Sequence, residues 1–380
     1  MKRIVELMSS FQFIAPCLMG IEKLLSNELK YMGAENVTAD NGRVFFKGDE
    51  SLFVRANIRS RFAERILLLV GRFDVQSFEE LFQGVKKIPW ERYIPQDGVF
   101  PVKGSCLSST LHSVPDCQAI IKKAIVERLK SVYKKDWFEE TGEMFKIQFL
   151  ILKNNVCIMI DTSGEPLHKR GYRAAANDAP IRETLAAALV ELSRVRNNHT
   201  VIDPCCGSGT IIIEAAQKAL NIQPNTERGF ISENWGLIPK AVWDHERELA
   251  RSEVRTDAAF QGFGYDIDEN ALEIASENAR KAGVADYITF RKKDLNNFSE
   301  ELERATIICN PPYGERLLDI REAEQLYRIM GEKFIAKPGW SYTVICPDDD
   351  FEKCFGRTAD KRRKLYNGMI KCQVYQFFKY

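Results

Sequence analysis

From residue 164 onwards, short apolar segments alternate with segments of helical periodicity, and this alternation restricts the fold more strongly than any other property of the chain. Strands that alternate with helices at this spacing form a mainly parallel, doubly wound α/β sheet. The stretch 224–255 is rich in tryptophan and charge, and we expect it to be an insertion between the first two strand–helix units. The predicted strands span residues 200–203, 262–266, 288–291, 306–309, 342–346 and 369–378, and the first predicted helix begins at Pro180.

Residues before 164 follow a different pattern, in which short strands and helices are mixed. We therefore expect a small α+β region ahead of the doubly wound sheet. Its predicted strands lie at 11–18, 43–47, 66–73 and near 99–103, its helices at 20 to about 33, from 77 onwards and over 117–135, and a hairpin over 146–152 and 156–161.

The composition limits the classes of protein to consider. The chain is 45% hydrophobic and 28% charged, and its longest aliphatic run, 66–70, is far shorter than the roughly 18 apolar residues of a membrane span. Ten cysteines without a C-x-x-C pair indicate a reducing, cytoplasmic environment and no structural metal. The net charge of +1 excludes a uniformly basic nucleic-acid-binding surface, so such binding must come from local patches.

A glycine-rich turn, Asp203-Pro-Cys-Cys-Gly-Ser-Gly-Thr210, joins the first strand of the predicted sheet to a helix. Gly207 and Gly209 allow a ligand to approach the backbone at the carboxyl end of this strand, where doubly wound sheets bind ligands. Ile212 replaces the third glycine of the dinucleotide fingerprint and a P-loop lysine is missing, which disfavours pyrophosphate and triphosphate ligands. Asp203 is poorly placed for phosphates but suits a cationic amino-acid group.

Two further acids follow the next predicted strands. Asp266 ends the second strand, where a carboxylate can accept hydrogen bonds from both ribose hydroxyls. Asp294 ends the third strand, where an acceptor can bind the exocyclic amine of adenine. Acceptors for an amino acid, a ribose and an adenine, without residues for phosphate, together predict S-adenosylmethionine. The alternative is that Asp266 and Asp294 cap the helices that follow them.

The fourth predicted strand is followed by Asn310-Pro-Pro-Tyr313. The Asn310 side-chain oxygen and the Pro311 carbonyl can each accept a hydrogen bond from a planar exocyclic amine, because Pro311 and Pro312 fix the backbone. Tyr313 is expected to stack on the base. This arrangement favours in-line attack of the amine nitrogen on a sulfonium methyl group, with orientation supplying most of the rate. Cys309 belongs to a predicted buried strand, so we expect it to pack rather than to act as a nucleophile.

Three elements of the sequence resemble those of THUMP-containing class I RNA methyltransferases that make N2-methylguanosine, particularly the bacterial enzymes that act on 23S ribosomal RNA. They are the glycine turn, Gly264-Tyr-Asp-Ile-Asp268 and Asn310-Pro-Pro-Tyr-Gly-Glu-Arg316. Cys205 replaces the usual apolar residue of the family's turn. The resemblance extends over nearly the whole chain, but Asn-Pro-Pro-Tyr alone also occurs in adenine-N6 DNA methyltransferases and does not choose the base.

The resemblance implies three domains: an N-terminal ferredoxin-like domain (1–70), a THUMP RNA-binding domain (71–163) and a Rossmann-like methyltransferase domain (164–380). It also implies that Arg182 and Glu183, in Ala179-Pro-Ile-Arg-Glu-Thr-Leu185, border the methionine end of the cofactor. The candidate cofactor-binding residues are Arg182, Glu183, Asp203, Cys205, Gly207, Gly209, Thr210, Asp266, Ile267, Asp294 and Asn310, and the candidate catalytic residues are Asn310, Pro311, Pro312 and Tyr313.

RNA contacts are expected from basic segments on both halves. One segment without an acid is His168-Lys-Arg-Gly-Tyr-Arg173. It resembles a basic loop that, in the family, lies near the target nucleotide. The candidate RNA-binding residues are His168, Lys169, Arg170, Tyr172, Arg173, Lys103, Lys122 and Lys123, with further basic runs at Arg55, Arg59, Arg61 and Arg65 and at Arg362, Arg363 and Lys364. The alternative for each segment is a solvated surface.

The sequence therefore predicts a cytoplasmic, S-adenosylmethionine-dependent methyltransferase that modifies the exocyclic N2 of a guanine in 23S rRNA, without a metal. The same chemistry on tRNA remains an alternative, as does a non-catalytic RNA-binding assembly factor. A DNA adenine methyltransferase would explain the Asn310 motif but would leave the N-terminal half without a role.

Overall fold

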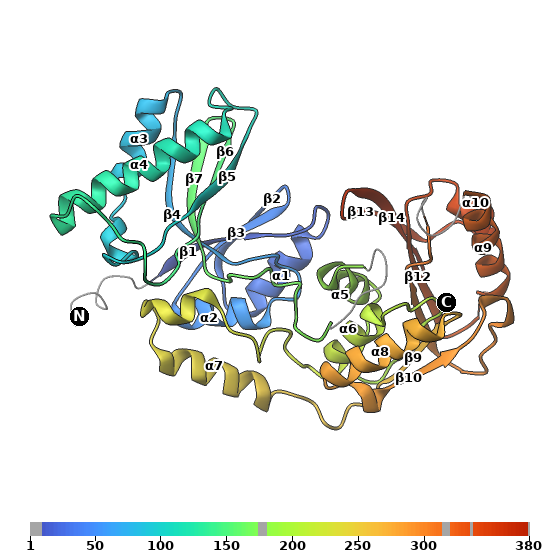
Figure 1. Ribbon diagram of the computed structural model, residues 1–380. Coiled ribbons are helices and arrows are strands. Elements are labelled where there is room, and N and C mark those ends of the chain that lie inside the picture. Colours follow the sequence, from blue (N-terminus) through green and yellow to red (C-terminus); the bar gives the residue numbers. More distant parts are fainter. Residues whose placement is uncertain (1–9, 174–180, 314–319, 335–336, 379–380) are drawn as a thin grey trace.

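The computed structural model describes residues 10–173, 181–313, 320–334 and 337–378. Two seven-stranded sheets form its framework, one in each half of the chain (Figure 1). No helix within these ranges is long and apolar enough to cross a membrane.

The N-terminal half forms one continuous sheet in the strand order β2-β3-β1-β4-β7-β6-β5. Asp49 caps α2 and Ser77 caps α3, each by accepting a backbone N–H hydrogen bond from the first helical turn. The strands are β1 (Phe11–Pro16), β2 (Glu35–Asp40), β3 (Arg43–Gly48), β4 (Leu67–Asp74), β5 (Val102–Leu107), β6 (Ile147–Leu152) and β7 (Asn155–Asp161). The helices are α1 (Glu22–Tyr31), α2 (Glu50–Arg59), α3 (Phe78–Lys87), η1 (Trp90–Arg92) and α4 (Val114–Tyr133).

Strand β4 joins the two parts of this sheet. It pairs antiparallel with β1, where Leu67 lies opposite Ile14, and antiparallel with β7, where Leu67 lies opposite Asp161. The expected domain boundary at residue 70 thus falls inside a strand. The two N-terminal parts share one hydrogen-bonded sheet instead of being connected by a linker.

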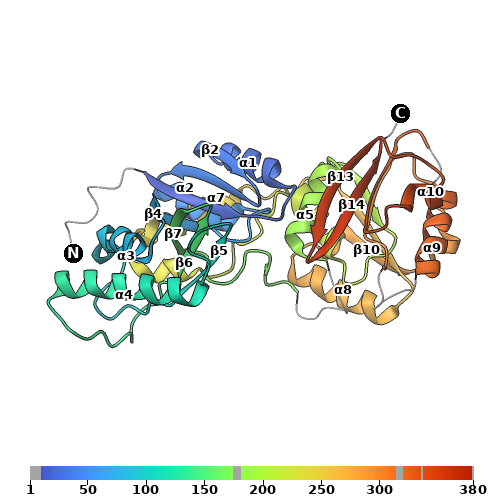
Figure 2. The same cartoon turned by 90° about the horizontal axis from the view of Figure 1, so that it is seen from above.

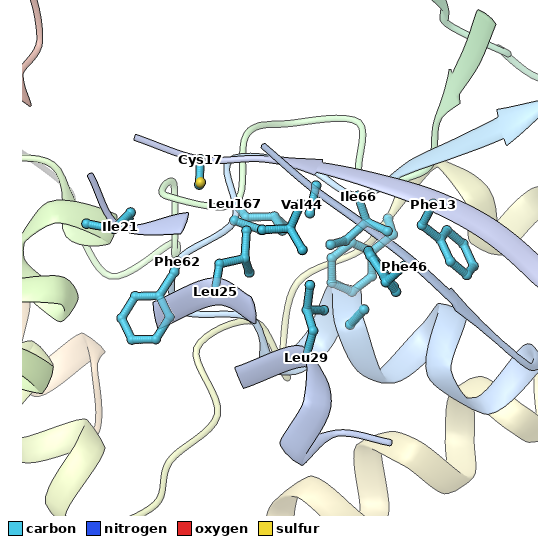
Figure 3. Close-up of a cluster of buried hydrophobic side chains, with 14 of the residues drawn as sticks. Phe13, Cys17, Ile21, Leu25, Leu29, Val44, Phe46, Phe62, Ile66 and Leu167 are labelled. Atoms are coloured by element: carbon cyan, nitrogen blue, oxygen red, sulfur yellow. The ribbon is translucent and has the colours of Figure 1, made fainter. Parts of the chain in front are cut away.

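Buried apolar side chains hold the first part of this sheet against α1 (Figure 3). Phe13 of β1 and Phe46 of β3 stack with their ring centroids 4.9 Å apart. Leu167, which follows the sheet in sequence, is fully buried in the same cluster, and its N–H donates to the Glu64 carbonyl. The segment after β7 is therefore fixed to the N-terminal half before the chain enters the second sheet.

The second sheet has the order β10-β9-β8-β11-β12-β14-β13. Neighbouring strands from β10 to β12 are parallel, whereas β14 is antiparallel to both of its neighbours. The strands are β8 (Thr200–Asp203), β9 (Gln261–Asp266), β10 (Ile288–Lys292), β11 (Ala305–Cys309), β12 (Trp340–Cys346), β13 (Lys361–Asn367) and β14 (Ile370–Phe377). The helices are α5 (Glu183–Leu192), α6 (Thr210–Ala219), η2 (Ile231–Trp235), α7 (Lys240–Ser252), α8 (Glu269–Lys281), η3 (Ala285–Tyr287), η4 (Leu295–Asn297), α9 (Ile320–Lys333) and α10 (Phe351–Phe355).

The expected doubly wound sheet is confirmed, and its six predicted strands agree with the structure to within two residues. The prediction missed two edge strands. No residue of β2 is buried, and β13 opens with four consecutive cations, Lys361 to Lys364. Edge strands often carry charge that prevents further pairing, and this charge hides the alternation by which a strand is recognised.

The insertion 224–255 returns the chain to the N-terminal half, where α7 lies against α2 (Figure 1). Arg55 makes a bidentate pair with Glu246 at 2.6 and 3.0 Å. Arg59 pairs with Glu253 at 2.5 Å, and Arg61 donates to the Ile222 carbonyl. We call these contacts, together with those of Arg170 described below, the arginine seam.

The basic run that begins in α2 is therefore paired inside the protein, and the structure does not support the expectation that it forms an RNA-binding face. Its arginines meet acceptors from other parts of the chain, and Arg65, which follows them, pairs with Asp161 at 2.5 Å. Apart from the Met32 carbonyl, which also accepts from Arg55, these acceptors lie between about 95 and 195 residues further along the chain, so no local pattern revealed them.

Candidate active site

The carboxyl edge of the second sheet brings together the strand ends that the sequence singled out. Strands β8 and β11 are parallel neighbours, with Ile202 opposite Ile307. The chain leaves β8 towards β9 and leaves β11 towards β12, so the sheet changes its winding direction between them. Ligands bind at such switch points in doubly wound folds. Asp203 is the last residue of β8, and Asn310 immediately follows β11.

The glycine turn between β8 and α6 depends on its glycines. Gly207 and Gly209 have φ values of 49° and 79°. A Cβ atom at Gly209 would lie 3.0 Å from Ala275 Cβ, so a larger residue would be strained and crowded. The turn is tied to β9, because the Gly207 N–H donates to Asp266 Oδ2 at 2.8 Å.

Asp203 is a buried acid at the base of this turn. It is 1% exposed, and the Cys205 N–H donates to its Oδ1 at 3.2 Å. Burial raises the pKa of Asp203 to about 8, and the nearby Asp266 carboxylate acts in the same direction. No cation of the described residues lies close enough to lower the pKa of Asp203. A cationic ligand group would offset the cost of ionising this acid.

Asp266, Ile267 and Asp294 follow the glycine turn along the same edge. Asp266 accepts from Gly207 and Asp268, whereas Asp268 is the residue that caps α8, so the capping alternative does not hold for Asp266. Asp294 does cap η4 by accepting from the Asn296 N–H, so for Asp294 that alternative is realised. Ile267 is 66% exposed and offers an apolar surface beside the acids.

Asn310 follows β11 directly and carries a buried polar atom. Its Oδ1 atom is buried and has no hydrogen-bond partner within the described residues. The next residue, Pro311, is buried, and Pro312 is half-buried. A buried acceptor without a donor is costly unless a ligand supplies one. Burial raises the pKa of the Cys309 thiol well above its ordinary value, which keeps it protonated and disfavours a cysteine nucleophile.

The hydroxyl of Tyr313 contacts β13 and β14, the two strands at one edge of the second sheet. This hydroxyl accepts from Asn367 Nδ2 at 2.8 Å and lies 3.8 Å from Cys372 Sγ. Both partners belong to the β13–β14 hairpin, which the sequence did not connect with the motif. Stacking of the half-buried Tyr313 on a base stays a prediction.

The loop from His168 to Arg173 corrects the expectation of an RNA-binding loop. The Arg170 side chain is fully buried, and its Nε donates to Glu214 Oε1 at 3.1 Å. Arg170 also donates to the Arg61 and Leu167 carbonyls. Tyr172 is 3% exposed and donates to the same Glu214 oxygen at 3.1 Å. Neither residue can reach RNA in this structure.

Two other residues of this loop are also engaged inside the protein. His168 Nδ1 lies 2.8 Å from Glu64, and Arg173 donates to Thr210 Oγ1 at 2.8 Å and lies 3.4 Å from Glu183. Of the predicted RNA contacts in the loop, Lys169 alone has an exposed side chain, paired with Glu165. The acids come from other elements, which explains why a loop without an acid was misread. The sequence contained one indication that these side chains are paired inside the protein: Glu214 is an acid within the otherwise apolar start of α6.

Arg182 and Glu183 open α5 near the glycine turn. Arg182 is exposed, whereas Glu183 is 3% exposed and its Oε2 has no hydrogen-bond partner in the described part of the chain. Burial raises the pKa of Glu183, and Arg173 opposes the shift. Because Arg173 links Glu183 to Thr210, the start of α5 is held beside the start of α6. Contact with a cofactor stays a prediction for both residues.

Among the three basic candidates of the N-terminal half, Lys103 and Lys123 are exposed. Lys122 is less available for contact with RNA, because its side chain has partners within the protein. Its Nζ donates to Glu140 at 2.6 Å and to the Phe100 carbonyl, and it lies 3.3 Å from the Phe100 ring centroid. Burial lowers the pKa of Lys122. We therefore correct Lys122 from an RNA contact to a residue that fixes α4 to the segments around Phe100 and Glu140.

Three family models match the chain. A model described as RMKL-like, methyltransferase domain matches residues 170–376, one described as RlmL ferredoxin-like domain matches 12–67, and the THUMP domain model matches 75–161. They confirm the expected order of a ferredoxin-like part, a THUMP part and a Rossmann-like methyltransferase part.

Curated relatives match over nearly the whole chain. The YpsC protein of Bacillus subtilis (strain 168), provisionally named an RNA methyltransferase, is 44% identical over 98% of this chain and 97% of its own length. The ribosomal RNA large subunit methyltransferase K/L of Psychromonas ingrahamii is 35% identical over 95% of this chain and 49% of its own. The chain thus spans about half the length of that relative.

Solved structures agree in fold. A protein of Listeria monocytogenes str. 4b F2365, described as an N6-adenine-specific DNA methylase, is 45% identical with a TM-score of 0.93, covering 98% of this chain and 97% of that one. SMU.472, described as a methyltransferase complexed with SAH, is 40% identical with a TM-score of 0.92, covering 98% and 99%. Both descriptions are provisional.

Proposed function

The chain belongs to the RMKL-like methyltransferase family, and on that premise we propose that it transfers a methyl group from S-adenosylmethionine to the exocyclic N2 of a guanine in 23S rRNA. The proposal depends above all on Asn310, whose buried Oδ1 has no donor within the described residues at the end of the central strand. A planar amine is the ligand group that would supply this donor.

S-adenosylmethionine brings a methyl group that is electrophilic because its sulfur carries a positive charge. The residues at the carboxyl edge fit its other groups. Asp203 would bind the amino group, Asp266 the ribose hydroxyls, and Ile267 with Asp294 the adenine. The SAH complex of SMU.472 supports this cofactor assignment.

The residues of this chain would act by positioning. Asn310 Oδ1 and the Pro311 carbonyl would accept hydrogen bonds from the two amine N–H groups, which turns the nitrogen lone pair towards the methyl group. As the new bond to nitrogen forms, the bond between sulfur and the methyl group would break, SAH would be the leaving group, and the amine would release one proton to solvent. The same oxygens would stabilise the positive charge that develops on the nitrogen during transfer. A covalent nucleophile is unnecessary, in keeping with the raised pKa of the Cys309 thiol.

An RNA substrate is supported by the THUMP match and by the names of the relatives. Exposed Lys103 and Lys123 of the N-terminal half are the basic residues that would bind phosphates there. The choice of 23S rRNA follows the ribosomal RNA methyltransferase K/L relative.

The test is to incubate the protein with labelled S-adenosylmethionine and total RNA from cells that lack it, digest the product and identify the nucleoside and its parent RNA. We expect N2-methylguanosine in large-subunit rRNA. The same nucleoside in tRNA would show that the substrate is tRNA. N6-methyladenosine would overturn the assignment of guanine as the methylated base. If no RNA were labelled, the proposed activity would fail and the non-catalytic assembly factor would be the alternative.

A further inference from the structure

The β13–β14 hairpin extends past the end of the sheet at the carboxyl edge. The last residue pair between β12 and β14 is Cys346 opposite Gln373, so β14 begins three residues beyond it, at Ile370. The two strands are closed by Gly368 and Met369, with a positive φ at Gly368. The hairpin lies on the side of the second sheet that faces the N-terminal half (Figure 1 and Figure 2).

The inner face of the hairpin is fixed at two points. Asn367, next to the turn, donates to the Tyr313 hydroxyl at 2.8 Å, three residues after Asn310. Arg363 donates to the Gly20 carbonyl of the N-terminal half at 3.1 Å. Leu365 and Cys372 are buried between these points. The tip is therefore held in a defined position beside the candidate catalytic motif.

The outer face of the hairpin is basic and aromatic. Lys364 and Tyr366 alternate on one face of β13, and Lys371 of β14 lies opposite Tyr366. Lys364 and Lys371 are exposed, and no acid pairs with either in the described residues. Arg362 differs, because it pairs with Glu352. Lys364 Nζ lies 5.5 Å from the centroid of the Tyr366 ring. Two cations without an acidic partner beside an aromatic ring are chemically complementary to an RNA strand.

The tip exposes large apolar side chains. Met369 is 98% exposed and Ile370 is 47% exposed. Exposed apolar residues at the tip of an anchored hairpin have no role in packing. Proteins that unstack bases insert such side chains between them, and enzymes that modify a base in a structured RNA must first take that base out of its stack.

We propose that the β13–β14 hairpin holds the RNA beside the target guanine, with Lys364 and Lys371 on phosphates and with Met369 and Ile370 in the space that the extruded base leaves. The inference rests on the proposed function in one respect, because it takes the base to enter beside Asn310. The recessed position of the Asn310 oxygen requires such extrusion.

The phosphate contacts are tested by the salt dependence of RNA binding. Total rRNA from cells that lack the protein is the probe, and the variants are Lys364→Gln and Lys371→Gln. Each should lower the slope of log affinity against log salt by about 0.8, the value for one lost phosphate contact. Lys361→Gln is the matched control, because Lys361 is exposed at the opposite end of β13. Slopes equal to wild type in both variants would overturn the proposal.

The apolar tip is tested by single-turnover methylation of two RNAs: a stem-loop that contains the mapped guanine and an unstructured oligonucleotide around it. Met369→Ala combined with Ile370→Ala should slow methylation of the stem-loop by about tenfold, because unstacking is no longer assisted. The oligonucleotide should react at a rate within twofold of wild type. Met144→Ala, a half-exposed methionine of the N-terminal half, is the control. Equal losses on both RNAs would contradict the role of the tip.

The two experiments separate this inference from the proposed function. If the wild-type protein methylates no RNA, the proposed function fails, while the salt slopes still decide whether the hairpin binds RNA. If methylation is confirmed and all hairpin variants behave like wild type, the hairpin proposal alone fails.

Discussion

The arginine seam and the carboxyl edge of the second sheet differ in whether their polar groups have partners within the described residues. In the seam, Arg55, Arg59, Arg61 and Arg170 each donate to an acceptor from a distant part of the chain. At the carboxyl edge, the oxygen of Asn310 has no donor within the described chain, and Asp203 is buried there without a cation.

This difference shows that charge is a poor guide to function here, whereas an unsatisfied polar group at a ligand-binding edge is a good one. The seam also contains nitrogens that have no hydrogen-bond partner among the described residues, such as Arg59 Nε, so a missing partner is informative only where the fold provides a binding site. The seam should therefore affect stability, and the edge should affect transfer and cofactor binding.

The largest expected effect follows the loss of the Asn310 oxygen. Asn310→Ala should lower the single-turnover methylation rate by about a thousandfold, the upper range for removal of one preorganised group that stabilises transition-state charge. Cofactor affinity, measured by calorimetry with SAH, should be nearly unchanged. A variant that loses SAH binding instead would assign Asn310 to the cofactor and would weaken the comparison.

The next effect tests the seam. Arg170→Met should destabilise the protein by about 3 kcal/mol in urea unfolding, because it leaves the fully buried Glu214 without its cation. Adding Glu214→Gln should recover part of the loss, since the amide oxygen can still accept from Tyr172. If Arg170 bound RNA instead, the variant would reduce RNA affinity and leave the free energy of unfolding unchanged.

A smaller effect is expected at Asp266. Asp266→Ala should weaken SAH binding by about thirtyfold, within the range for hydrogen bonds to a charged group. Asp268→Ala is the control, because the neighbouring acid caps α8 and should change stability by about 1 kcal/mol without changing SAH affinity. Equal losses of affinity in the two variants would point to a general disturbance of the β9–α8 turn.

The sequence predicted the position of the candidate site in the sheet better than it predicted the contacts around that position. Asp203, Asp266 and Asn310 could be placed at one edge because the carboxyl ends of parallel strands meet there. Strand β13 could not be recognised, because its cations obscure any alternation. Its contact with Tyr313, which carries the further inference, was therefore invisible.

The basic segments were misread for a related reason. Arg170 and Lys122 have their partners 44 and 18 residues away, and a one-dimensional pattern gives no sign of such pairs. Likewise, nothing in the residues around position 70 indicated that β4 would join two parts into one sheet. Local patterns identified elements and their ends, whereas contacts between distant elements required the structure.

The acidity of Asp203 provides a pH test of the carboxyl edge. Because its pKa is raised to about 8, Asp203 is mostly protonated in the free protein at pH 6. A cationic amino group selects the ionised form, so binding releases a proton, and SAH affinity should rise by up to about tenfold per pH unit between pH 6 and 7.5. The ligand's own amino group stays mostly charged over this range, because the neighbouring carboxylate of the ligand favours the charged form.

Calorimetry across this pH range, in buffers of different ionisation enthalpy, measures both the affinity and the proton release. Asp203→Asn should bind SAH weakly and without the rise. An affinity of the wild-type protein that does not change with pH would show that Asp203 does not bind the amino group.

The smallest effects distinguish seam cations from surface cations. Glu253, the partner of Arg59, is about one third exposed and can be solvated without its cation, so Arg59→Gln should cost less than about 1 kcal/mol of stability and should leave the salt slope of RNA binding unchanged. Lys123→Gln should do the reverse: stability should be unchanged, and the slope should fall by about 0.8 because an exposed phosphate contact is lost. Urea unfolding and salt titrations of the two variants measure both quantities. If Arg59→Gln lowered the slope as much as Lys123→Gln, the seam would belong to the RNA-binding surface after all.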